Sequence, residues 1–258
     1  MSFLHFHIIP TTFCPEKCPY CINSSKKFEE IEFNDYLLFL KKLHELQNSY
    51  KLILEFNGGE FTLSKNLYQY FEKLNSLNIF QLILTTNFNS CNKKYIKILN
   101  IIKDFNIQTI EFFVTFHFNK DKKFLNKIKE FLELTKEYNY IFTINLIKGL
   151  PLIENNWNKY FNEINELKNF DKRLNINYSK YIEKSNIKQG KTYNKENKKL
   201  CKGGIYYFLG EYISDACRNH KYSIIDFKPN HNLIYCDKTC PNQDFSLKIF
   251  KPRFLKKR

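Results

Sequence analysis

No apolar run in this sequence approaches the roughly 20 residues that a helix needs to cross a bilayer. The N-terminus also lacks the basic segment and the small-residue cleavage site of a secretory signal peptide. These two absences exclude the membrane-spanning and secreted classes, so we expect a cytoplasmic protein without a membrane partner. A chain of 258 residues suits one large α/β domain, or such a domain with a small appendage.

Alanine is nearly missing, since Ala216 is the only one, whereas Lys, Asn, Ile, Phe and Tyr are abundant. An AT-rich coding sequence imposes this bias, so part of the formal charge of +15 follows from composition. The densest basic runs lack the regular aromatic residues of a base-stacking surface. These runs are Lys195–Lys202 and Phe250–Arg258. We therefore expect a solvated basic surface, and nucleic acid is not the favoured partner.

The eight cysteines fall into groups of three, one and four along the chain. This number fits a reducing compartment if the thiols bind metals rather than form disulfides. Three plus four is the division expected of two clusters, and Cys91 is then the isolated thiol without a ligand role. The two groups are Cys14, Cys18 and Cys21, and Cys201, Cys217, Cys236 and Cys240.

The first group has the spacing C-x3-C-x2-C and follows the apolar run Phe3–Pro10. Gaps this short hold no helix or strand, so the loop must wrap its thiols around one point. Such a group usually binds metal, and three thiolates suit a [4Fe–4S] cluster with one iron left without a local ligand. Two alternatives stay open: a zinc site with His5 or His7 as fourth ligand, and buried core thiols.

This motif resembles the signature of the radical S-adenosylmethionine (SAM) enzymes, C-x3-C-x-aromatic-C, with Tyr20 in the aromatic position. The resemblance implies that the open iron binds the amino and carboxylate groups of SAM, with Tyr20 against the adenine. It also implies that one electron cleaves SAM to a 5′-deoxyadenosyl radical. The spacing alone implies only a cluster with one free iron.

Strand-like and helix-like segments alternate along the first 180 residues. Repeated strand–helix units predict a parallel sheet with right-handed crossovers, and six units predict a partial (β/α)6 barrel, the core fold of the resembled family. The predicted strands are Phe3–Pro10, Lys51–Phe56, Ile79–Thr86, Thr109–Phe118, Tyr140–Lys148 and Leu174–Tyr178. The predicted helices are Phe33–Tyr50, Leu63–Leu77, Lys93–Phe105, Lys122–Tyr138 and Asn156–Phe170.

The second predicted strand ends in Gly58-Gly59-Glu60. Two glycines let the backbone approach a ligand closely, and Glu60 places a carboxylate at the mouth of the barrel. By the resemblance, this run matches the Gly-Gly-Glu-Pro segment that meets the amino group of SAM. Phe61 replaces the usual proline here, which reduces loop rigidity but leaves the hydrogen-bonding groups in place.

Further polar residues lie near the carboxyl ends of the later strands, where ligand sites gather in parallel barrels. Asn87 also fits a turn, and His117 also fits a hydrogen-bonded residue at a strand end. Asn145 lies inside an apolar strand, and a buried amide needs partners. By analogy with the family, we expect these residues to contact SAM: Asn87, Thr115, His117 and Asn145.

The pattern changes beyond the sixth strand. We assign residues 1–180 to the barrel, 181–200 to a linker, 201–245 to a cysteine-rich segment and 246–258 to a basic tail. The four late cysteines, Cys201, Cys217, Cys236 and Cys240, suffice for a second [4Fe–4S] cluster. Ile205–Ile213 fits a small hairpin between ligands. The segment resembles a SPASM or twitch appendage, although a full SPASM appendage has more cysteines; a zinc staple stays the alternative.

Together these patterns predict a radical SAM enzyme that abstracts hydrogen from a peptide or a small molecule. A reductant such as flavodoxin or ferredoxin would supply the electron, and the second cluster would bind substrate or accept an electron. One alternative is an RNA-modifying radical SAM enzyme, which the positive charge permits. The other is a zinc-stabilised binding module without catalysis.

Overall fold

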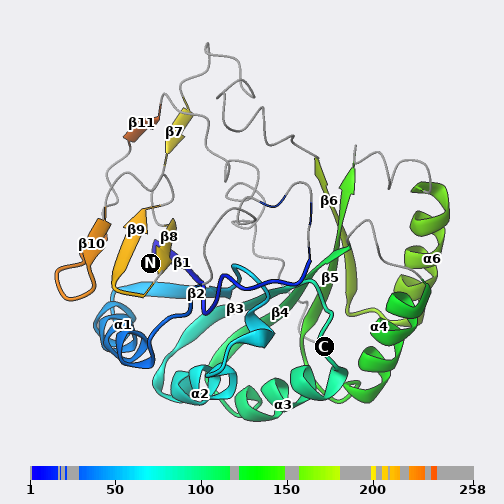
Figure 1. Cartoon of the computed structure of the whole chain (residues 1–258), viewed down its shortest axis with the longest axis horizontal. Helices are drawn as coiled ribbons and strands as arrows, with labels where there is room; N and C mark the ends of the chain where they lie inside the picture. The colour runs from blue at the N-terminus through cyan, green and yellow to red at the C-terminus, as the bar shows by residue number, and fades with distance from the viewer. Residues whose placement is uncertain are drawn as a thin grey trace.

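A computed structural model of the chain describes residues 2–16, 18, 21, 29–116, 122–148, 157–180, 199–201, 205–208, 210–215, 221–229 and 234–236. Six parallel strands lie next to one another in chain order in the main sheet (Figure 1). They are β1 (Ser2–Ile8), β2 (Tyr50–Phe56), β3 (Ile79–Thr86), β4 (Ile107–Phe116), β5 (Ile141–Lys148) and β6 (Leu174–Lys180). Because β6 is at one edge and does not pair with β1, the barrel is open. The predicted α/β fold, a partial barrel of six parallel strands, is confirmed.

Helices connect these strands and cover one face of the sheet (Figure 1). They are α1 (Phe33–Leu46), η1 (Phe61–Leu63), α2 (Leu67–Glu72), η2 (Lys73–Ser76), α3 (Asn92–Ile102), α4 (Lys122–Leu134) and α6 (Trp157–Phe170). The single helix predicted over Leu63–Leu77 is wrong, since α2 lies between two 3₁₀ turns. Ser64 has an extended backbone, and the side chain of Glu30 accepts hydrogen bonds from the Ser64 hydroxyl and the Lys65 N–H before α2 begins. No helix of the described residues is long and apolar enough to span a membrane.

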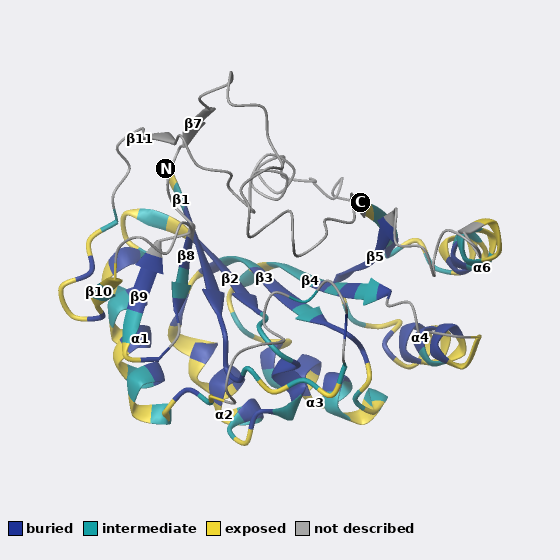
Figure 2. Ribbon diagram, turned by 45° about the horizontal axis from the view of Figure 1, so that its top comes forward, coloured by how far each residue is buried: buried dark blue, intermediate teal, exposed yellow. Residues whose placement is uncertain are grey.

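The core lies between the strands and the helices, and Figure 2 shows both layers buried where they meet. Alternate residues of each strand point to this side, as a period of two requires. Ring pairs join the layers with centroids 5.4, 4.6 and 5.3 Å apart: Phe6 with Phe39 of α1, Phe56 with Phe71 of α2, and Phe112 with Phe131 of α4. Burial of such aromatic side chains is what attaches the helices to the sheet.

The other face of the sheet carries polar side chains, although parallel sheets are ordinarily apolar on both faces. Hydrogen bonds between neighbouring strands join these side chains to one another. The pairs are Thr85 with Glu55, Gln81 and Thr143 with Glu111, and Asn177 with Asn145. This polar face, as we call it below, suits a ligand that forms hydrogen bonds rather than a packed apolar core.

The hairpin expected over Ile205–Ile213 forms as β8 (Ile205–Phe208) and β9 (Tyr212–Asp215). It is part of the main sheet, since β8 pairs in parallel with β1 and β10 (Lys221–Ser223) pairs with β9. Phe208 explains the attachment, because its ring stacks 4.2 Å from that of Phe39 in α1. A separate pair consists of β7 (Lys199–Cys201) and β11 (Ile234–Cys236).

Candidate functional site

The cysteine loop docks on the loop that follows β2. Three backbone hydrogen bonds continue the pairing of β1 and β2 past the ends of the strands. Asn57 N–H donates to Ile8 (2.9 Å), Gly59 N–H to Thr11 (3.0 Å) and Glu60 N–H to Phe13 (2.7 Å). These backbone hydrogen bonds therefore hold the segment before Cys14 against the Gly-Gly-Glu run.

The two glycines explain how closely these loops approach. A Cβ atom on Gly59 would lie 2.2 Å from the carbonyl oxygen of Phe13, and one on Gly58 would lie 2.3 Å from the side chain of Ile9. Gly58 also has a φ of +112°, a conformation that disfavours other residues. The close approach that the sequence predicted for a ligand is made here by the cysteine loop itself.

The same loop is held from its other side by the segment that leads into α1. Thr12 N–H donates to the carbonyl of Glu29 (2.9 Å), and Ile31 N–H donates to the carbonyl of Pro10 (3.0 Å). The Thr12 hydroxyl accepts a further hydrogen bond from Glu29 N–H (2.8 Å). Two separate segments of the chain thus clamp the backbone next to the first thiol.

None of the three thiols of this loop forms a disulfide. Cys18 is buried, whereas Cys14 and Cys21 are half-buried, and Cys21 N–H donates to the carbonyl of Cys18 (3.1 Å). Burial raises the pKa of the Cys14 thiol, and the nearby charge of Glu60 raises it further. Cys91 is exposed at the start of α3, and the sequence predicted no ligand role for it.

Glu60 is 1% exposed, and its carboxylate is engaged within the protein. Oε1 accepts hydrogen bonds from the Thr62 hydroxyl (2.6 Å) and the Thr86 hydroxyl (2.9 Å). Oε2 accepts one from the Asn87 backbone N–H (2.9 Å). Burial raises the pKa of this carboxyl although the hydrogen bonds oppose the effect. Glu60 therefore ties the end of β3 to the loop that carries the cysteines, and its expected contact with SAM stays a prediction.

Asn87 connects the end of β3 to the cysteine loop. Its side-chain Nδ2 donates to the Sγ atom of Cys14 at 3.5 Å, a normal length for a hydrogen bond to sulfur. Its backbone N–H is held by Glu60, which fixes the residue relative to the sulfur. The sequence indicated Asn87 as a SAM-binding residue, and the structure adds a direct contact with a candidate cluster ligand.

Thr115 and Asn145 lie side by side on β4 and β5. The side chain of Asn145 accepts a hydrogen bond from Asn177 on β6 (2.9 Å), which satisfies part of this buried amide. Both residues belong to the polar face.

Four of the predicted site residues lie outside the described residues: Tyr20, His117, Cys217 and Cys240. Cys201 and Cys236 lie on the adjacent strands β7 and β11, but the described part of the chain does not include their side chains.

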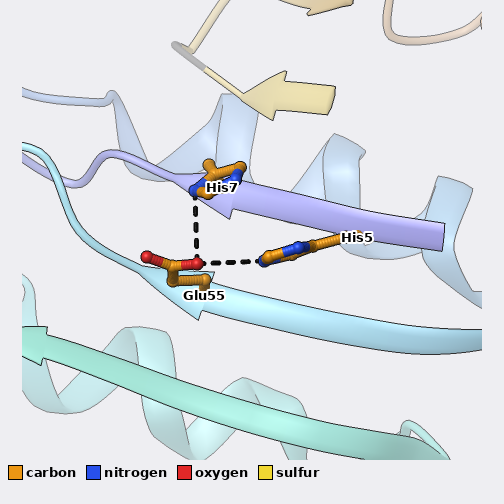
Figure 3. A group of neighbouring side chains, drawn as sticks. All are labelled: His5, His7 and Glu55. Carbon is orange, nitrogen blue, oxygen red and sulfur yellow. Dashed lines mark hydrogen bonds and ion pairs between the residues drawn. The ribbon is translucent and has the colours of Figure 1, made fainter. Parts of the chain in front are cut away.

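Two histidines and a glutamate form a further group on β1 and β2 (Figure 3). Oε2 of Glu55 lies 3.0 Å from Nε2 of His5 and 3.4 Å from Nδ1 of His7. Burial alone raises the pKa of the Glu55 carboxyl, but the adjacent His7 and His5 bring it well below its ordinary value. Sequence reasoning weighed either histidine as a zinc ligand beside the thiols. It missed Glu55, whose only signal was a charged residue within an apolar strand.

The model of the radical SAM superfamily matches residues 8–162 of this chain. No curated protein matches the chain. Among solved structures, Streptococcus suis SuiB bound to the precursor peptide SuiA is 12% identical, with a TM-score of 0.51. That match covers 92% of this chain and 65% of SuiB.

Two further structures are similar at lower TM-scores. BtrN in complex with AdoMet and 2-DOIA is 22% identical, with a TM-score of 0.45, and the match covers 56% of this chain and 58% of BtrN. Native anSMEcpe with bound AdoMet and a Kp18Cys peptide is 22% identical, with a TM-score of 0.49, over 69% of this chain and 52% of that one. The chain thus spans less than two thirds of the length of these structures. From the superfamily match over more than half of its length, the chain belongs to the radical SAM superfamily, a family of enzymes that implies a [4Fe–4S] cluster and SAM.

Proposed function

We propose that this protein is an enzyme that cleaves SAM reductively at a [4Fe–4S] cluster held by Cys14, Cys18 and Cys21. The observation that carries the proposal is the clamped cysteine loop. Its backbone is hydrogen-bonded to Gly59 and Glu60 on one side and to residues 29–31 on the other. A loop fixed at this edge of the sheet holds its thiols where ligands bind in parallel α/β barrels.

The residues present fit such a cluster. None of the three thiols forms a disulfide, and the side-chain N–H of Asn87 donates to Sγ of Cys14, as is common around cluster ligands. Among the described residues, the group whose donor atoms converge closely enough for one ion is His5, His7 and Glu55, not the three thiols. A mononuclear zinc site would need the thiols to converge on one ion, whereas a cluster offers a separate iron to each.

When bound, the cluster and SAM supply the one-electron cleavage that yields a 5′-deoxyadenosyl radical able to abstract hydrogen from a substrate. The chain supplies the positions. Gly58 and Gly59 let the two loops close together, and Glu60 holds Asn87 against Cys14. Tyr20 would lie against the adenine, and Thr115, His117 and Asn145 would contact the rest of SAM.

The polar face supports a hydrogen-bonding substrate, either a peptide or a small molecule. Glu55, Glu111 and Asn145 lie on this face of β2, β4 and β5, and their hydrogen-bond partners are themselves polar side chains. A packed core at this place would carry apolar residues instead. A substrate bound against these strands would lie beneath the cysteine loop, within the open barrel.

The late cysteines, Cys201, Cys217, Cys236 and Cys240, would ligate a second [4Fe–4S] cluster in a twitch-like segment. Support for this part of the proposal is the pairing of β7 with β11, which places Cys201 and Cys236 on adjacent strands. A flavodoxin or ferredoxin would supply the electrons. Zinc at these four thiols is the competing proposal, and metal analysis of the purified protein separates the two.

The test is formation of 5′-deoxyadenosine from SAM after anaerobic reconstitution and addition of dithionite. Wild type should form the product, and Cys18→Ala should reduce its rate to the level without protein. Cys91→Ala removes an exposed thiol outside the loop and should leave the rate unchanged. Equal rates for Cys18→Ala and wild type would contradict the proposed role of the loop.

A further inference from the structure

We propose that His5, His7 and Glu55 bind one divalent transition-metal ion on the polar face of the sheet, apart from the thiol loop. The three side chains are 1%, 8% and 6% exposed, and they come from two neighbouring strands. Figure 3 shows both imidazoles turned toward the carboxylate from β1. Imidazole nitrogen and carboxylate oxygen are the donor set of zinc and of non-haem iron(II) sites.

The spacing of the donor atoms agrees with such an ion. The oxygen Oε2 of Glu55 lies 3.0 Å from Nε2 of His5 and 3.4 Å from Nδ1 of His7. Bonds of about 2.0–2.2 Å in a tetrahedral site separate the ligand atoms by about 3.3–3.6 Å. All three donor atoms lie within 4.8 Å of one another, so the two nitrogens would need to approach each other by about 1 Å at most.

Asn57 indicates which atom of His7 faces the group. Its Nδ2 lies 3.0 Å from Oε1 of Glu55 and 2.6 Å from Nδ1 of His7. The contact with the carboxylate fixes the amide orientation, since the amide oxygen in that place would face another oxygen. With the amide in this orientation, Nδ1 of His7 accepts the hydrogen bond from Asn57, and an ion that binds Nδ1 would replace this hydrogen bond. On metal binding, Asn57 would keep its hydrogen bond to Glu55 and lose its hydrogen bond to Nδ1 of His7, whose lone pair would then bind the ion.

Outer partners hold the three ligands in place, as they do in established metal sites. Oε1 of Glu55 accepts hydrogen bonds from Asn57 and from the Thr85 hydroxyl (2.9 Å), which leaves Oε2 toward the histidines. The rings of His5 and His7 stack with centroids 4.4 Å apart, and Tyr207 of β8 stacks on His7 at 4.7 Å. Ligands carried on paired strands are positioned more rigidly than ligands on loops.

Charge also favours a cation here. The buried carboxylate of Glu55 carries a negative charge, which a divalent ion bound beside it would offset at short range. Three protein ligands leave a fourth position of a tetrahedral ion open. That position would take water or an oxygen or nitrogen atom of a bound substrate. The site does not depend on the SAM chemistry proposed above, and either can fail without the other.

The experiment measures zinc bound by the cluster-loaded protein after dialysis against micromolar Zn²⁺. We expect wild type to retain one more zinc per chain than Glu55→Gln and than His5→Gln. His44→Gln is the matched control, because His44 lies on α1 and bonds to Ser76, outside the group. It should retain as much zinc as wild type. Equal zinc in Glu55→Gln and wild type would overturn the proposal.

Crystals of the wild type grown with Zn²⁺ provide a reading that needs no variant. Anomalous maps on either side of the zinc absorption edge distinguish zinc from cluster iron. A zinc peak between the two imidazoles and the carboxylate is expected. Its absence at a zinc concentration that fills other sites would overturn the proposal and leave a hydrogen-bonded group of three side chains.

Discussion

The substitution Gly59→Ala tests whether the clamp between the two loops places the first thiol. A Cβ atom at residue 59 would lie 2.2 Å from the Phe13 carbonyl oxygen, and real contacts of this kind stay above 3.0 Å. The loops must therefore separate by about 0.8 Å, the difference between those two values. The same movement lengthens the 2.7 Å hydrogen bond from Glu60 to Phe13 to about 3.5 Å, beyond normal length.

The energetic cost follows from these distances. Loss of two backbone hydrogen bonds, from Gly59 and Glu60, costs about 1–3 kcal/mol. Overpacking against backbone atoms adds about 1–3 kcal/mol. Because about 1.4 kcal/mol corresponds to a factor of ten in an equilibrium constant, cluster retention should fall at least tenfold.

The assay is iron and sulfide per chain after anaerobic reconstitution and removal of free iron by gel filtration. Gly210→Ala is the control, because Gly210 has a φ of +101° but its nearest neighbouring atom, on Asp35, lies 3.8 Å from the added Cβ. That variant should lose about 1–2 kcal/mol of stability through backbone strain and keep its cluster. Full cluster content in Gly59→Ala would refute the inferred role of the clamp.

Three further predictions concern the cluster and the stability of the fold. Asn87→Leu removes the N–H donor to Cys14, so the cluster potential in a redox titration should fall by about 20–65 mV, equivalent to about 0.5–1.5 kcal/mol for one electron. Arg173→Ala removes the 2.6 Å contact with Asp171 and a 3.4 Å hydrogen bond to the Tyr138 carbonyl, so urea unfolding should show a loss of about 2–3 kcal/mol. Burial raises the pKa of Asp171, but the hydrogen bonds and charge of Arg173 outweigh it and lower the pKa, so the contribution of the contact is present above the unfolded pKa of about 3.9 and is lost as pH falls. The difference between wild type and Arg173→Ala should accordingly shrink between pH 7 and about pH 3, and a constant difference would contradict this reasoning.

The sequence predicted the six parallel strands because each strand is a short apolar run followed by a segment of helical period. It did not predict that β8 joins β1, since that pairing joins residues about 200 positions apart and the segment contains only four residues. The failed helix over Leu63–Leu77 has a similar cause, because the backbone of Ser64 is extended (ψ 140°) and its hydroxyl donates to Glu30, which comes from a distant part of the chain.

The site shows the same division between local pattern and long-range contact. The spacing of Cys14, Cys18 and Cys21 predicted a thiol loop, and the position of Gly59 after the second strand predicted a close approach. The partner in that approach was not predictable, since it depends on how two loops meet above the sheet. The group around Glu55 depends on the register of β1 against β2, which no local pattern specifies.

The electron paramagnetic resonance spectrum of the reduced protein, before and after addition of SAM, tests most directly whether the thiol loop holds a cluster with one iron free for SAM. We predict a [4Fe–4S]⁺ signal that changes its g values when SAM is added and that Cys18→Ala lacks. A cluster signal from the loop that SAM leaves unchanged, or a protein that binds zinc at these thiols and shows no such signal, would contradict it.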